Sequence, residues 1–95
     1  MKIKLNIFVN RIDGKPLDDG PGTEPLKLSE LLVRSLCNLQ SQDAEEKFKC
    51  YMVATKIHEK DEADIALSDL ELIKKSLNVY APGVMGPIRM HLESL

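Results

Sequence analysis

The sequence has few aromatic residues, no tryptophan and no long apolar run. Its aromatic side chains are Phe8, Phe48, Tyr51 and Tyr80, so the core must be built mainly from aliphatic residues and methionine. No apolar run approaches the roughly 18 residues that a membrane-spanning helix needs. The N-terminal residues alternate between polar and apolar, whereas a signal peptide has an unbroken apolar stretch. We therefore expect a cytoplasmic protein that does not bind membranes.

Basic residues are not in excess. The chain has 13 Lys and Arg against 15 Asp and Glu, which gives a formal net charge of −2. Because a strongly basic surface supplies most of the non-specific affinity of proteins for nucleic acids, this balance argues against unaided binding to DNA or RNA.

Residues that could ligate metals or catalyse reactions are few and scattered. Cys37, Cys50, His58 and His91 lie far apart in the sequence, whereas zinc ligands usually come in short spacings. Asp18-Asp19-Gly20 has oxygen ligands suited to calcium but lacks the ligand series and final glutamate of an EF-hand. No nucleophile elbow or oxyanion loop is present. We expect two reduced thiols, no metal, no cofactor and no enzymatic activity.

What is present indicates one small globular domain over residues 1–95. Apolar residues make up 43% and charged residues 29% of the chain, which is an ordinary globular balance. The predicted fold class is α+β. We expect a mostly helical domain with an N-terminal β-hairpin or small antiparallel sheet, followed by three to four packed helices.

The N-terminal segment predicts a strand over residues 2–9. Its apolar residues alternate on one face: Ile3, Leu5, Ile7 and Val9. Asp13-Gly14 is a turn signal, and Pro16 limits any return strand to a short edge segment. Residues 18–25 contain two glycines and two prolines and should form a surface loop.

Three capping signals predict the starts of three helices. Ser29 should cap a mostly apolar, central helix that ends near residue 39, and Asp43 should cap a helix over residues 44–58. Ser68, with Glu71 three residues later, forms a capping box for the third helix. Residues 65–67 should form a short strand beside the first one.

The inward faces of these helices follow from helical spacing. The second helix should bury Cys50, Val53, Ala54 and Ile57, and it carries a second apolar stripe at Phe48, Tyr51 and Met52. The third should bury Leu70, Ile73 and Leu77.

A last helix is expected over about residues 83–94. Pro87 must lie in its first turn or kink it, so the sequence leaves open whether the helix begins before or after Pro87.

The segment from Tyr80 to Pro87 mixes apolar side chains with Pro and Gly outside any regular period. Proline restricts the free chain as well as the bound one, so such a segment can hold apolar groups outward at low ordering cost. We therefore predict a partner-binding surface at Tyr80, Val84 and Met85. A structured loop between two helices is the alternative interpretation.

The order of these features resembles a group of small proteins encoded by tailed bacteriophages and prophages, generally of unassigned function. The resemblance is carried by residues 13–17, 24–32, 46–57, 67–75 and 80–88. It implies an accessory protein in the cytoplasm of a bacterial host that binds another protein, as an assembly factor or as a modulator of a host or phage protein. The partner could also be a second copy of the chain.

The alternative function is a small DNA-associated transcriptional regulator. Its support in the sequence is a set of lysines in the second helix, Lys47, Lys49 and Lys56, which neighbouring glutamates dilute.

Overall fold

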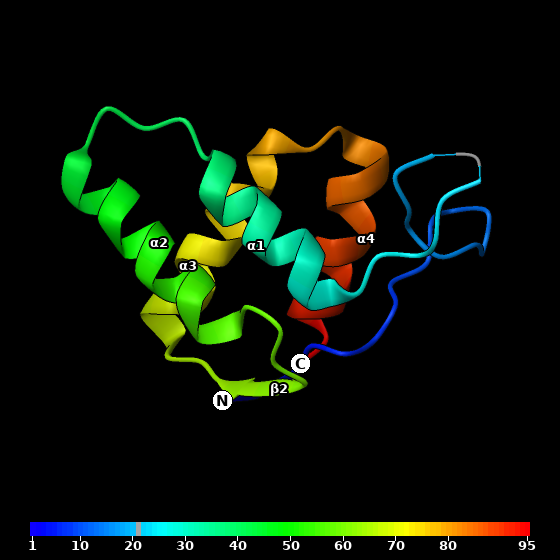
Figure 1. Cartoon of the computed structure of the whole chain (residues 1–95), viewed down its shortest axis with the longest axis horizontal. Coiled ribbons are helices and arrows are strands. Elements are labelled where there is room, and N and C mark those ends of the chain that lie inside the picture. Colours follow the sequence, from blue (N-terminus) through cyan, green and yellow to red (C-terminus); the bar gives the residue numbers. More distant parts are fainter. Residues whose placement is uncertain (21) are drawn as a thin grey trace.

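A central helix, α1 (Leu28–Asn38), organises the fold, as the sequence predicts for its most apolar helix. In the computed structural model, which describes residues 1–20 and 22–95, α1 packs against three elements: α2 (Ala44–Ile57), α3 (Leu67–Ser76) and the short 3₁₀ helix η1 (Leu77–Val79). The last helix, α4 (Pro82–Glu93), adjoins η1. Figure 1 shows α2 at one end of the longest axis and the loops of residues 9–20 and 22–25 at the other.

A two-stranded antiparallel sheet completes the domain and confirms the α+β class. β1 (Lys2–Lys4) pairs with β2 (Glu62–Asp64), with Ile3 opposite Ala63. The sheet therefore joins the N-terminus to the segment between α2 and α3. A short strand does pair with β1, but it consists of residues 62–64. The strand predicted at residues 65–67 is wrong, because Leu67 already begins α3.

The N-terminal segment keeps the predicted alternation but not the predicted strand length. Ile3, Leu5 and Val9 are buried and Ile7 is half-buried. The regular ladder ends at Lys4 because the backbone partners then change. The N–H of Leu5 donates to Asp61, while the carbonyls of Leu5 and Ile7 accept from the first turn of α1.

The predicted turn and edge segment are present as isolated pairings. Gly14 has φ 85°, and Asn10 pairs with Pro16 by a single bridge, since proline cannot extend a ladder as a donor. The predicted loop at residues 18–25 includes Pro21, which lies outside the described residues. On either side of it, Asp18 forms a bridge with Pro25.

Of the three predicted caps, Asp43 is correct and the other two are wrong. Asp43 accepts from the N–H of Glu45 at 2.9 Å. α1 starts at Leu28, before Ser29, because the carbonyls of Ile7 and Leu5 already bond the N–H groups of Leu28 and Ser29.

The third helix also starts before its predicted cap. α3 begins at Leu67, before Ser68, because Ile65 is held in extended backbone by the carbonyl of Met1 and Ala66 accepts the first helical bond, from Leu70. In both helices the start is therefore decided by backbone groups from other segments.

The predicted inward stripes of the helices are confirmed. The core contains the expected residues of α2 and α3, together with Ile88 and Leu92 of α4. Two buried hydroxyls join α1 to α3: the Ser35 and Ser76 oxygens lie 2.9 Å apart, and either can donate to the other. Each oxygen is also within hydrogen-bond distance of a carbonyl of its own helix, so the two hydroxyl protons serve three contacts. The second apolar stripe of α2 is exposed.

Among the described residues, no helix has both the length and the apolar character required to cross a bilayer.

Candidate partner-binding surface

The structure places the three predicted binding residues at the junction of η1 and α4. Tyr80, Val84 and Met85 are each half-buried and pack against the core. The Tyr80 hydroxyl donates to the carbonyl of Leu31 in α1, and burial raises the pKa of Tyr80 to about 12. Tyr80 therefore fixes this junction onto α1, and Met85 is the member of the three that lines a surface hollow.

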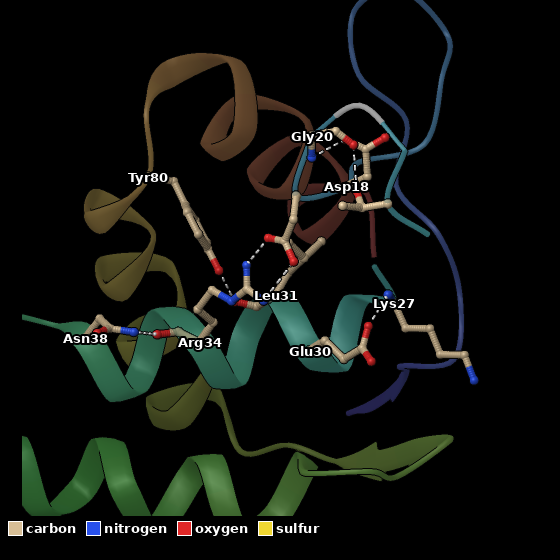
Figure 2. A network of polar contacts seen from close by, with 10 residues as sticks. Asp18, Gly20, Lys27, Glu30, Leu31, Arg34, Asn38 and Tyr80 are labelled. Atoms are coloured by element: carbon tan, nitrogen blue, oxygen red, sulfur yellow. Dashed lines mark hydrogen bonds and ion pairs between the residues drawn. The ribbon is translucent and has the colours of Figure 1, made fainter. Parts of the chain in front are cut away.

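A polar network surrounds the Tyr80 contact and attaches the loop of residues 18–20 to α1 (Figure 2). Arg34 of α1 donates to both carboxylate oxygens of Asp19, and this hydrogen bonding lowers the pKa of Asp19. Asp18 accepts from the N–H of Gly20 at 3.0 Å. The two carboxylates that the sequence offers to calcium thus have protein partners, and their arrangement is structural.

The solvent face of α4 is apolar and forms one wall of a groove. The other wall comes from the turn at residues 10–12, and the groove has a volume of about 600 Å³. Ile12 is fully exposed at its rim, and Met90 on α4 is 76% exposed. Gly83, Gly86 and Pro87 also line the groove. We call this feature the α4 groove.

Local sequence explains why α4 presents such a surface. Pro82 occupies the first helical position, where its missing N–H costs nothing. Pro87 lies inside the helix, so the helix begins before it, which answers the question left open by the sequence. Because Pro87 has no N–H, the carbonyl of Gly83 cannot receive its helical hydrogen bond. That carbonyl remains available as an acceptor.

Arg11 adds a donor to the same groove. Its Nε atom is buried and makes no hydrogen bond, although Asp13 Oδ1 lies 3.5 Å away. The Nη1 atom of the same guanidinium lies 3.8 Å from Asp18 Oδ1. Asp13 and Asp18 therefore occupy part of the guanidinium, and its remaining N–H groups are the donors that it offers to the groove. The α4 groove therefore combines apolar walls with one donor group and one acceptor.

Sequence reasoning missed Ile12 and Met90, the two most exposed apolar side chains of the groove. Ile12 stands directly before the Asp13-Gly14 turn, where a bulky apolar residue has little chance of burial. Met90 lies outside the inward stripe that Ile88 and Leu92 define. The sequence could therefore have indicated that both side chains are exposed, but it could not have indicated that they lie close together.

The cysteines are free thiols. Cys37, on the central helix α1, is exposed, and Cys50 on α2 is buried. Burial raises the pKa of Cys50, which disfavours its reactive thiolate. In the part of the chain that the structure describes, no three His, Cys, Asp or Glu side chains are grouped so as to hold a metal ion.

Comparison with known proteins found no matching family model, no matching curated protein and no matching solved structure.

Proposed function

We propose that this protein works by binding another protein through the α4 groove, in the role that the sequence pattern implies for a phage or prophage accessory protein. The observation that carries the proposal is the pair Ile12 and Met90, which project from two segments distant in sequence onto one groove. Fully burying a side chain of this size is worth about 1.5–3 kcal/mol. A partner that covers both therefore gains substantial free energy.

The chemistry of the groove favours an apolar segment that carries an acidic residue. The walls accept apolar side chains, and the guanidinium of Arg11 can bond a carboxylate. The carbonyl of Gly83 can accept a backbone or side-chain N–H from the same segment. Tyr80, Val84 and Met85 pack against the core, and Met85 lines a neighbouring hollow that shares Gly86 and Met90 with the groove.

The alternative function, a DNA-associated regulator, has less support. Of the three lysines on which it depends, Lys56 is engaged by Asp69 at 3.1 Å. The formal net charge of −2 also opposes association with a polyanion.

Crosslinking from the groove can identify the partner. A photoreactive residue at position 12 should capture a protein in a phage-infected or lysogenic host, whereas the same residue at position 67 should not. Leu67 is the matched control position because, like Ile12, it is an exposed aliphatic residue. Its side chain is 70% exposed and does not line the groove. Equal capture from both positions would count against the groove.

The captured protein should then be purified and titrated against variants. Ile12→Ser with Met90→Ser should raise the dissociation constant about tenfold or more, equivalent to about 1.4 kcal/mol. Leu67→Ser should leave the dissociation constant unchanged. Arg11→Gln should weaken binding if a carboxylate is bound. Undiminished affinity in the double variant, with the fold intact by circular dichroism, would refute the proposal.

A further inference from the structure

The outward face of α2 is a second unpartnered apolar surface. Figure 1 shows α2 at the opposite end of the longest axis from the N-terminal loops, which supply one wall of the α4 groove. Phe48, Tyr51 and Met52 are 59%, 60% and 44% exposed. At 100° per residue they lie on the side of the helix opposite Val53 and Ile57, which are buried. α2 is therefore apolar on two sides, and the fold covers one of them.

Charged residues border this face in an ordered way. Helical spacing places Glu45 and Lys56 on the same edge, Glu45 near the N-terminal end of α2 and Lys56 near the C-terminal end. Glu45 forms no ion pair within the described residues, and Lys56 contacts Asp69. Lys49 lies between Glu45 and Lys56 along the helix on the same edge, about 20° farther round than Lys56 and toward α3. Lys47 borders the opposite edge.

We propose that two copies of the chain associate through α2, packed antiparallel about a two-fold axis near Tyr51 and Met52. In that arrangement the same edges of the two helices face each other in reverse order. Glu45 of each copy then lies opposite Lys56 of the other, so the edge is complementary to itself. Phe48 of each copy packs beside Thr55 of the other.

A hollow lies on each side of α2, and each can receive side chains from α2 of the second copy. One lies between α2 and the C-terminal end of α1, where Cys37, Leu39 and Tyr51 line it, and the other lies between α2 and α3. A helix of this length spans about 21 Å. Its face alone provides less than the about 800 Å² per partner of a typical stable complex. The dimer should therefore be a weak one that dissociates on dilution.

A head-to-tail contact between the α2 face and the α4 groove fits less well. It would join two different surfaces, so by itself it would not close into a two-fold dimer. Antiparallel pairing of α2 instead leaves both grooves of the dimer free, one at each end. This inference goes beyond the proposed function and does not require it.

Sedimentation velocity of the purified chain over a micromolar to millimolar range tests the dimer. The wild type should shift from monomer to dimer with concentration. Phe48→Ser with Tyr51→Ser should raise the dimer dissociation constant about tenfold or more, while Phe8→Ser, another exposed aromatic, should not change it. A wild type that stays monomeric throughout, or a dimer that the Ile12→Ser and Met90→Ser changes abolish instead, would overturn the inference.

A charge exchange tests the antiparallel register. Glu45→Lys and Lys56→Glu should each weaken the dimer, and the double variant should recover it. Crosslinking provides a second readout in a Cys37→Ser background: Met52→Cys, near the two-fold axis, should form an intermolecular disulfide readily, and Ala44→Cys should not. Failure of the double exchange to recover the dimer, together with equal crosslinking at both positions, would exclude this register.

Discussion

Tyr80 shows how one polar atom can fix the position of a helix. Its ring packs against the core and its hydroxyl reaches the carbonyl of Leu31, so the start of α4 is attached to the central helix (Figure 2). Burial raises the pKa of Tyr80 to about 12, and the neighbouring Arg34 opposes part of this rise. The residue predicted as a binding contact therefore has a structural role in holding the binding surface.

The raised pKa of Tyr80 predicts a loss of stability at high pH. The ordinary tyrosine pKa is about 10, so the unfolded chain releases this proton before the folded protein does. The contribution of Tyr80 to the stability of the folded state is fully present below pH 10, and it is lost as the pH rises toward 12. Urea unfolding between these pH values should show a falling midpoint in the wild type and a smaller fall in Tyr80→Phe.

At neutral pH the same variant should lose one hydrogen bond. We expect Tyr80→Phe to lower the free energy of unfolding by about 0.5–1.5 kcal/mol. An unchanged stability at pH 7 combined with an unchanged slope at high pH would show that the bond to Leu31 does not contribute.

At the scale of the element, α4 combines residues that rarely share a helix. Proline disfavours helical backbone in the residue before it, because its ring contacts that residue's Cβ. Gly86 precedes Pro87 and has no Cβ, which lets the helix continue through this position. Apart from the chain neighbours, an added Cβ would meet no atom within 4 Å at either Gly83 or Gly86. The two positions therefore differ in that Gly86 directly precedes a proline.

The proline after Gly86 predicts different effects for two similar substitutions. Gly83→Ala should stabilise the protein by about 0.5–1 kcal/mol, because alanine has less backbone freedom to lose on folding. Gly86→Ala should give no such gain, since its Cβ would meet the Pro87 ring. Adding Pro87→Ala to Gly86→Ala should recover the gain. Thermal unfolding monitored by circular dichroism distinguishes the outcomes, and an equal gain at both glycines would contradict this account.

At the scale of the whole molecule, ion pairs join elements that are distant in sequence. Lys75 of α3 holds Glu46 of α2 at 2.8 Å, and Arg34 of α1 holds Asp19 of the N-terminal loop. The first pair joins two different helices, α2 and α3. Hydrogen bonding from these cations lowers the pKa of both carboxyls, Glu46 and Asp19.

Lowered carboxyl pKa values predict a loss of stability in acid. Free Asp and Glu have pKa values of about 3.9 and 4.3. The two ion-paired carboxylates therefore stabilise the fold above about pH 4, and this stabilisation is lost as the pH falls through their lower pKa values in the folded state. The urea midpoint should therefore decline below about pH 4, and Glu46→Gln should decline less steeply. An identical decline in wild type and variant would show that the Glu46–Lys75 pair does not contribute.

The sequence by itself determined the fold class and the buried faces. Alternation along residues 2–9 and helical spacing in α2 and α3 depend on local geometry, because which side of a strand or helix is apolar is set by residues a few positions apart. The same reasoning explains the correct cap at Asp43, whose side chain bonds a backbone N–H two residues away.

Only the tertiary structure decided where the strands pair, where α1 and α3 begin, and what forms the candidate site. The helix starts depend on carbonyls of Leu5, Ile7 and Met1 that belong to distant segments. The α4 groove exists because folding brings Ile12, near one end of the chain, beside Met90, near the other. No local periodicity encodes that proximity, since it results from the packing of α4 onto a core to which every element contributes.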